Sequence, residues 1–485
     1  MLRAIAAAAA VGLSITTTAA LGQNLMEKSI AELARMVKAQ EVTAVELVET
    51  AIAHAKAQAG LNAFITLDEE RALAAARQID AIVAAGGETM PLAGVPIAVK
   101  DNINVAGMRT TAGTPGIDFV PDATAPIAAR LQAAEAIVVG KTNMHELAFG
   151  ITSANTAFGA VGNAIDPTKF AGGSSGGTAA AIAAGIVPAG LGSDTGGSVR
   201  IPAALNGIVG FRPTTWRYSQ EGVVPISATR DVVGPMARSV GDIVMMNAIM
   251  NGGNVTEALN VEGLRLGIAR PHSDNLSPGV AAAFEAAQAR LREGGAELVD
   301  IDLSEIVTAA NKASFPIALY EVKRDLGNFL ARYQPATTVE DIAAEIASPD
   351  VKGIFMGAVL GDGAVPEAAY EEAVGSIDAL RDAYVAALDA AGLDGIIYPV
   401  TPLEAQPIEG TGEIVTLNCQ EVPTFPTFIR NTDPSSIYGA PGLSLPIGRT
   451  PEGLPVGMEL DGRPDGDLDL LAIGLAVEAA LKAEE

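Results

Sequence analysis

A serine at the end of a glycine-rich loop is the first sign of chemistry in this chain. Ser198 follows two glycines, and the loop comes after an apolar run. Glycines have no Cβ, so successive backbone N–H groups can turn toward one point. Such groups stabilise the oxyanion that forms when a nucleophile attacks a carbonyl. The loop therefore predicts acyl transfer, unless it is only a glycine-rich turn that a serine caps. The predicted oxyanion-hole residues are Thr195, Gly196, Gly197 and Ser198, with Ser198 as the nucleophile.

A serine nucleophile needs a base, and Lys100 is the candidate. This lysine follows the apolar run 95–99, which Gly94 precedes, as expected for a short buried strand. Burial disfavours the charged ammonium and lowers its pKa, so a neutral amine can accept a proton. The alternative is an exposed lysine at the end of a strand, which is the commoner fate of lysines.

A second glycine-rich run, residues 172–177, contains Ser174 and Ser175. Its first five residues also fit G-x-S-x-G, the nucleophile elbow of α/β-hydrolases. An elbow must follow a strand and needs a later histidine, but residues 166–170 make a poor strand and His272 is the only histidine downstream. We interpret His272 as structural, and His145 likewise, so the elbow is the weaker hypothesis.

Strands that alternate with helices must position these side chains. The alternation is typical of an α/β fold, here a single large domain, residues 23–485, with a mixed, largely parallel sheet that helices cover. A mostly helical block, residues 305–392, has no assignable motif and is expected to pack over this domain, in a position to cover the active site. Strands are expected at 95–99, 136–139, 186–191, 207–209, 395–398, 443–447 and 456–460, and helices within 27–58 and at 69–85, 124–134, 177–184 and 468–481.

The composition excludes several classes of function. The formal net charge of −26 repels phosphate backbones, so we expect no nucleic-acid partner. The single cysteine, Cys419, excludes an internal disulfide, and three histidines are a poor supply of metal ligands. We therefore expect no metal and no cofactor.

The N-terminal residues predict export. Arg3 precedes an apolar run, residues 4–15, and small residues follow up to Gly22. This order is typical of a secretory signal peptide, here residues 1–22, which leaves Gln23 as the first residue of the mature chain. The apolar run is too short for a comfortable membrane span. We expect a soluble periplasmic or secreted protein with no membrane span in its mature form.

Three motifs together resemble the core of the amidase signature family: residues 94–101, 172–177 and 192–200. The resemblance implies amide hydrolysis by a Ser-Ser-Lys triad, here Lys100, Ser174 and Ser198. In that family the first serine of the middle motif follows a cis peptide bond and relays a proton between the lysine and the nucleophile. The spacing between Ser174 and Ser198 matches the family. The resemblance also implies that Ser175 is a hydrogen-bonding neighbour and that Asp194 and Arg200 brace the catalytic loop.

Two further stretches, residues 222–238 and 428–446, look similar to one branch of the family, the indoleacetamide and mandelamide hydrolases. Members of this branch cleave primary amides of arylacetic acids, so the resemblance implies a small arylacetamide-type substrate. The alternative for the aromatic residues of the expected pocket is that they belong to the core. The expected pocket residues are Phe149, Ile151 and Thr152 on one side and Phe425, Phe428 and Tyr438 on the other.

Other functions would use the same residues. Esters, anilides or carbamates react through the same tetrahedral chemistry. A binding protein on this scaffold that no longer turns over its ligand is a further alternative, because a fold does not guarantee a function. The expected partner is a small-molecule amide, and a homodimer is the oligomer that we consider.

Overall fold

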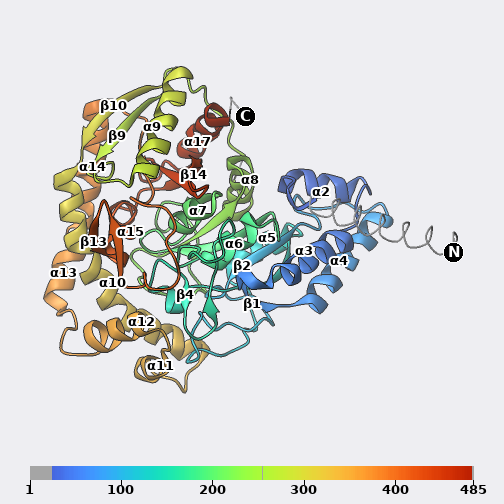
Figure 1. The fold of residues 1–485 in the computed structure, drawn as a ribbon. Coiled ribbons are helices and arrows are strands. Elements are labelled where there is room, and N and C mark those ends of the chain that lie inside the picture. The colour runs from blue at the N-terminus through green and yellow to red at the C-terminus, as the bar shows by residue number, and fades with distance from the viewer. Residues whose placement is uncertain (1–24, 254, 483–485) are drawn as a thin grey trace, which may run out of the picture.

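The computed structural model describes residues 25–253 and 255–482. The predicted signal peptide, residues 1–22, lies outside these ranges and stays a prediction. In the described part of the chain, one eleven-stranded mixed sheet runs through the molecule and helices pack around it (Figure 1). The predicted α/β fold class is confirmed.

The strands of the large sheet follow the order β1-β3-β2-β6-β8-β7-β14-β15-β11-β9-β10. Their bounds are β1 (Phe64–Leu67), β2 (Pro96–Lys100), β3 (Ile137–Thr142), β6 (Ala189–Asp194), β7 (Val209–Arg212), β8 (Val232–Ala237), β9 (Arg265–Arg270), β10 (Glu297–Asp302), β11 (Gly395–Pro399), β14 (Gly442–Arg449) and β15 (Pro455–Asp461). Two strand pairs stand apart from this sheet, namely β4 (Ala154–Asn155) with β5 (Gly159–Ala160), and β12 (Ile414–Leu417) with β13 (Gln420–Pro423).

The helices form two groups at the flanks of the sheet and several single segments between strands. In Figure 1, α2 to α4 lie on the right and α10 to α14 run along the left and lower side. The bounds are α2 (Ile30–Lys38), α3 (Ala44–Ala57), η1 (Ala59–Leu61), α4 (Glu69–Ala84), α5 (Pro126–Ala133), η2 (Glu146–Ala148), α6 (Gly176–Ala183), α7 (Arg200–Asn206), α8 (Val240–Asn251), α9 (Pro278–Glu293), α10 (Ser304–Tyr333), α11 (Val339–Glu345), α12 (Pro349–Ile354), η3 (Phe355–Val359), α13 (Glu367–Gly375), α14 (Ile377–Ala391), α15 (Thr424–Ile429), α16 (Asp433–Ile437) and α17 (Asp467–Lys482).

Parallel pairing brings the ends of several strands to one edge. β2 lies between β3 and β6 and is parallel to both, and β9 lies parallel to β10 and β11 on its two sides. The pairs between these two runs are antiparallel, as is the pair of β1 with β3. Since parallel neighbours end at the same edge, Lys100 at the end of β2 comes close to Asp194 at the end of β6.

Local signals in the sequence explain where the helices begin. Before α3, the Thr43 hydroxyl accepts a hydrogen bond from the N–H of Glu46 at 3.0 Å, and the Glu46 carboxylate accepts one from the N–H of Thr43 at 2.7 Å. This reciprocal cap satisfies two backbone donors that the first turn of a helix leaves free. The predicted helix within this range therefore starts where the threonine stands.

Strands β1, β8, β9 and β10 were not expected from the sequence. β8 lies between β6 and β7 in the middle of the sheet, yet it contains Gly234 and Pro235, which are rare in central strands. A Cβ at Gly234 would lie 2.3 Å from the Phe211 carbonyl oxygen of β7. The close approach of the two strands therefore requires glycine, and the same glycine hides the strand from pattern analysis.

The helical block 305–392 forms α10 to α14, with α10 packed on α13 and on α16. Residues of α10, α12 and η3 face the cavity that holds the predicted nucleophile. Within the described residues, no helix is both long enough and apolar enough to span a bilayer.

Candidate active site

Lys100 is completely buried at the end of β2. Its Nζ lies 2.7 Å from Ser174 Oγ and 2.9 Å from Ser193 Oγ. Burial lowers the pKa of Lys100 to about 7, against the attraction of the Asp194 and Asp231 carboxylates, which favours the ammonium. A substantial share of this amine is therefore uncharged at neutral pH and can accept a proton.

Ser174 and Ser175 lie in the turn that leads into α6, and both are buried. The peptide bond between Gly173 and Ser174 is cis. The N–H of Ser175 donates to the Ser198 carbonyl oxygen at 3.1 Å, and its hydroxyl lies 3.2 Å from the Ser193 carbonyl oxygen. Ser175 thus ties the loop of one serine to the loop of the other, while Ser174 contacts the lysine.

Ser198 stands between β6 and α7, on the wall of a cavity. Among residues 25–253 and 255–482, its hydroxyl makes no hydrogen bond to Ser174 or to Lys100. Hydrogen bonds between catalytic groups are often long or misaligned without substrate and tighten in the Michaelis complex. The structure thus places the Ser174 hydroxyl against Lys100 Nζ, and it places Ser198 on the cavity wall.

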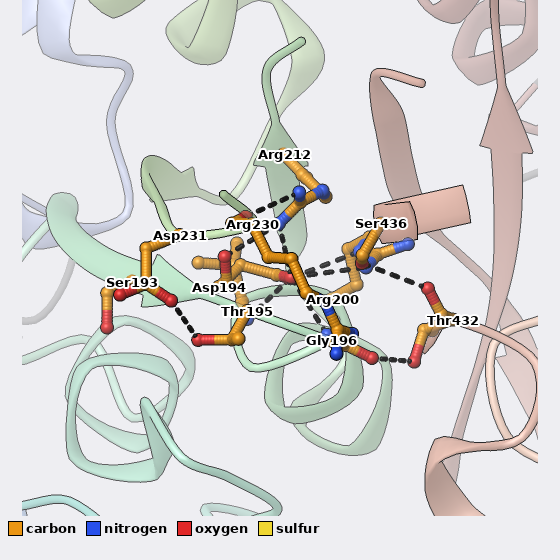
Figure 2. A network of polar contacts seen from close by, with 12 residues as sticks. Ser193, Asp194, Thr195, Gly196, Arg200, Arg212, Arg230, Asp231, Thr432 and Ser436 are labelled. Atoms are coloured by element: carbon orange, nitrogen blue, oxygen red, sulfur yellow. Dashed lines mark hydrogen bonds and ion pairs between the residues drawn. The ribbon is translucent and has the colours of Figure 1, made fainter. Parts of the chain in front are cut away.

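The carboxylate of Asp194 holds the loop that contains Ser198 (Figure 2). It accepts hydrogen bonds from the N–H of Gly197 at 2.8 Å and of Val199 at 3.0 Å, and it pairs with Arg200 and Arg212 at 3.1 and 3.0 Å. Burial disfavours its charge, but the two guanidinium groups outweigh burial and hold the pKa of Asp194 below its usual range. A permanently ionised carboxylate therefore fixes the backbone of the loop.

The same contacts decide which loop groups can act as oxyanion donors. The N–H of Gly197 is already donated to Asp194, so this residue contributes its backbone shape, with φ +137°, rather than a free donor. The Gly196 carbonyl oxygen accepts a hydrogen bond from Thr432 Oγ1 at 2.7 Å, which fixes the orientation of that peptide (Figure 2). Of the predicted set, the N–H groups of Thr195, Gly196 and Ser198 remain as candidates.

A cavity of about 150 Å³ opens beside Ser198. Of the expected pocket residues, Phe149, Ile151 and Phe425 line it. The other three lie elsewhere: Thr152 Oγ1 lies 3.4 Å from His145 Nδ1, Phe428 packs edge-on against Phe170, and Tyr438 stacks on Tyr384 with ring centroids 4.4 Å apart. The helical block supplies a wall that the sequence did not specify, made of Ser314, Phe315, Ala318, Leu319, Ile354 and Ala358.

Two polar residues near the triad were missed by sequence reasoning. Ser193 contacts Lys100 through its hydroxyl and also accepts from Asn102 Nδ2 at 2.9 Å. Asp231 accepts from Thr195 Oγ1 at 2.6 Å, and burial raises its pKa to about 6 despite that hydrogen bond and two more from backbone N–H groups. The signal was their position in the sequence: Ser193 closely follows the strand expected at 186–191, and Asp231 lies in the stretch 222–238 that resembles the indoleacetamide and mandelamide hydrolases.

The two histidines that we interpreted as structural have contacts away from the triad. His145 Nε2 lies 3.0 Å from Asp350 Oδ2, and its Nδ1 accepts from the N–H of Ser153 at 3.2 Å. His272 packs edge-on against Tyr398, and burial lowers its pKa to about 3. Directly before the 172–177 run, residues 166–170 form isolated bridges, such as that of Phe170 with Gly162, rather than a strand. The elbow hypothesis therefore lacks its strand.

Comparisons with known proteins place this arrangement in a wider group. The chain matches the family model described as Amidase over residues 46–471. It is 40% identical over 484 residues to the mandelamide hydrolase of Pseudomonas putida. This match covers 95% of this chain and 92% of that relative. It is also 40% identical over 457 residues to an indoleacetamide hydrolase of Agrobacterium vitis. That match covers 93% of this chain and 97% of the relative.

Solved structures agree with these sequence matches. A crystal structure described as that of an amidase has a TM-score of 0.84 at 36% identity, over 93% of this chain and 99% of that one. The native peptide amidase of Stenotrophomonas maltophilia has a TM-score of 0.82 at 28% identity, over 94% of this chain and 97% of that one.

Proposed function

Because the chain belongs to the Amidase family and is an amide hydrolase, we propose that it cleaves small arylacetamide-type amides with Lys100, Ser174 and Ser198. One observation gives the proposal its strongest support. A completely buried lysine with a pKa of about 7 lies 2.7 Å from the hydroxyl of Ser174, whose neighbour Ser175 is hydrogen-bonded to the backbone of Ser198.

The reaction begins with proton transfer. Ser198 Oγ gives its proton to Ser174 Oγ while Ser174 passes its own proton to the neutral Nζ of Lys100. Ser198 Oγ then attacks the amide carbonyl, and backbone N–H groups of the loop, the candidates being those of Thr195, Gly196 and Ser198, stabilise the oxyanion. The proton returns along the same path to the leaving nitrogen, because an amide anion is too basic to depart. Water finally hydrolyses the acyl-enzyme, which releases the carboxylic acid.

The arylacetamide class rests on the cavity and on the relatives. Three aromatic side chains, Phe149, Phe315 and Phe425, line the cavity beside Ser198, and they suit a flat apolar acyl group. The two relatives named above are called mandelamide and indoleacetamide hydrolase, and both names denote amides with an aromatic acyl part.

The test compares release of ammonia from phenylacetamide and indole-3-acetamide. We expect Ser198→Ala and Lys100→Ala to lose on the order of 10³-fold or more in kcat/KM while the fold survives, because nucleophile and base act as a unit. Labelling by a fluorophosphonate should disappear in Ser198→Ala. The control is His272→Ala, which should retain activity. An inactive His272→Ala beside an active Lys100→Ala would favour the elbow hypothesis instead, and hydrolysis of the matching esters but not of the amides would favour an esterase.

We further propose that the protein is exported. The support is the apolar run 4–15 after Arg3, followed by small residues. Expression in a Gram-negative host, followed by fractionation and N-terminal sequencing, should give a periplasmic chain that begins at Gln23. A cytoplasmic chain that retains residues 1–22 would contradict export.

A further inference from the structure

Two buried carboxylates of the helical block reach the loop that contains Asp231. Glu321 and Asp325 stand one turn apart on α10, so their side chains lie on the same face of that helix. Opposite them lies the loop 226–231, which leads directly into β8. The helical block, residues 305–392, carries no motif in the sequence, yet these two carboxylates connect it to a residue beside the triad.

The loop is hydrogen-bonded to α10 at three consecutive residues. Glu321 Oε2 accepts from the Ser227 hydroxyl at 2.5 Å and from the N–H of Thr229 at 3.0 Å. Glu321 Oε1 accepts from the Thr229 hydroxyl, and Asp325 Oδ2 accepts from the N–H of Ala228 at 2.8 Å. Four donors of the loop are thus satisfied by two side chains of one helix.

The helical block holds Glu321 from the other side. The Tyr370 hydroxyl of α13 donates to Oε1 at 2.9 Å, and Arg324 Nη2 lies 3.0 Å from the same oxygen. Burial disfavours the charge of Glu321, which is completely buried, but the hydrogen bonds from the loop and from Tyr370 outweigh burial and hold its pKa below the usual range. An ionised carboxylate accepts from all these donors at once.

The loop transmits this anchorage to Asp231. Its Oδ2 accepts from the N–H of Ile226 at 2.8 Å and of Ser227 at 3.0 Å, and its Oδ1 accepts from Thr195 Oγ1 at 2.6 Å (Figure 2). The charge of Asp231 also favours the ammonium of Lys100. Because Ser227 gives its N–H to Asp231 and its hydroxyl to α10, a displacement of this residue disturbs both contacts.

We propose that Glu321 is a positioning residue: by holding the loop 226–231 against α10, it keeps Asp231 in place beside Thr195 and Lys100. The inference rests on the proposed function to the extent that the rate reports the protonation of Lys100. Other titratable or charged groups also face these residues, namely Arg324, Asp325 and Tyr370 near Glu321, Arg230 near Asp231, and Asp194 near Lys100.

The first experiment measures kcat/KM on phenylacetamide against pH for the unchanged protein and for Glu321→Ala. The loop of the variant loses three hydrogen bonds, so Asp231 draws away from Lys100 and favours its ammonium less. The pH at half of the plateau should therefore fall by about half a unit or more. The plateau itself should fall by about 10-fold or more, because Thr195 loses its fixed partner. A half-plateau pH that stays in place or rises would overturn the inference.

The conservative variant separates hydrogen bonding from charge. In Glu321→Gln the side-chain carbonyl can accept from Ser227 and from the N–H of Thr229, while its amide can donate to the hydroxyls of Thr229 and Tyr370. This variant lacks the negative charge but keeps the anchorage, so its pH profile should match that of the unchanged protein. A shift as large as that of Glu321→Ala would assign the effect to charge and overturn the positioning role.

A double variant tests whether the effect passes through Asp231. Asp231→Asn combined with Glu321→Ala should have the same half-plateau pH as Asp231→Asn alone, because the two residues then act as one unit. The matched control is Glu305→Ala, an exposed glutamate at the start of α10, which should leave the profile unchanged. Equal shifts by Glu321→Ala in both backgrounds would overturn the inference.

Crystal structures of the variants supply a measurement that does not depend on activity. The distance from Thr195 Oγ1 to Asp231 Oδ1 should exceed the hydrogen-bond range in Glu321→Ala and stay within it in Glu321→Gln. If the unchanged protein hydrolyses no amide, the proposed function fails, and this distance alone decides the inference. If Glu321→Ala does not fold, Ser227→Ala combined with Thr229→Val removes the two hydroxyl contacts from the loop side instead. An unchanged distance in the variant that folds would overturn the inference.

Discussion

Two opposing forces set the protonation of Lys100. Complete burial favours the neutral amine, whereas the carboxylates of Asp194 and Asp231 favour the ammonium, and burial is the larger effect. A lysine with an ordinary pKa of about 10.4 would be almost entirely protonated at neutral pH and could not serve as a base. The depth of the residue in the molecule, rather than its type, makes it suitable for the proposed role.

The rate should therefore follow the titration of this amine. A general base works only when it is unprotonated, and the pKa of Lys100 is about 7, so kcat/KM should be low in acid, rise with pH through about 7 and level off above. Initial rates on phenylacetamide from about pH 5 to about pH 9 measure this. A rate that falls as the pH rises through neutrality would contradict the role of Lys100.

Asp231 should tune the same profile. Burial raises the pKa of this carboxyl to about 6, so it is largely ionised where Lys100 titrates, and its charge favours the ammonium. Asp231→Asn removes that attraction, so the pKa of Lys100 should fall further and the rising limb of kcat/KM should move to lower pH. Asp118→Asn, at the surface and paired with Arg109, is the control and should leave the limb in place. A limb that moves to higher pH in Asp231→Asn would argue against this coupling.

At the scale of elements, the loop between β6 and α7 owes its shape to several segments at once. Asp194 of β6 binds two of its N–H groups, and Thr432, just before α16, binds the carbonyl of Gly196. Gly197 combines φ +137° with a very close contact, since a Cβ there would lie 2.1 Å from Thr432 Oγ1. A side chain at this position would therefore displace the loop backbone or Thr432, and with them the proposed oxyanion donors.

Gly197→Ala should therefore impair catalysis. We expect kcat/KM to fall on the order of 10²-fold or more, because the loop N–H groups lose their alignment. Gly448→Ala is a matched control, since Gly448 has φ +148° but open space around the position of a Cβ. It shares the backbone strain without the clash and should keep its activity. Kinetics and thermal melting of both variants separate strain from misalignment, and an equal loss of activity in both would contradict the explanation.

Two phenylalanines of α15 should respond differently to truncation, although both were expected as pocket walls. Phe425 lines the cavity and tilts against Phe315, whereas Phe428 is completely buried against Phe170. Phe425→Ala should raise KM for arylacetamides by about 10-fold, with a smaller effect on propanamide. Phe428→Ala should instead lower the free energy of unfolding by about 3–5 kcal/mol. Steady-state kinetics and denaturant unfolding measure the two effects, and the reverse assignment would contradict the cavity described above.

At the scale of the whole molecule, the net charge of −26 affects which substrates approach. A strongly negative protein repels anions over distances that salt screens, with a Debye length of about 10 Å at 0.1 M ionic strength. We expect kcat/KM for an arylacetamide that carries an additional carboxylate to rise with salt, while that for neutral phenylacetamide stays nearly constant. Stopped-time assays at low and high ionic strength measure the difference. If kcat/KM for the anionic amide falls as salt is added, positive charge near the entrance of the cavity outweighs the overall negative charge, and the prediction is wrong.

The sequence by itself determined which residues could do chemistry, because these residues lie in short local motifs or stand at the ends of strands that the apolar pattern predicts. The apolar run before Lys100 predicts a buried strand, and the glycines around Ser174 and Ser198 predict backbones that few other residues adopt, so their type and order already indicate acyl transfer. The α/β fold class follows because short apolar runs, typical of strands, alternate along the chain with segments whose apolar residues have helical spacing.

Only the tertiary structure decided what surrounds those groups. It shows that the N–H of Gly197 is used by Asp194, that Ser193 contacts Lys100, and that β8 with its Gly-Pro pair lies in the middle of the sheet. It also separates Phe425 from Phe428, three positions apart on one short helix. The physical reason is that these outcomes depend on close packing between segments far apart in the chain. A local pattern specifies which residues are apolar or polar, but the neighbours across the interior decide which of them reaches the cavity.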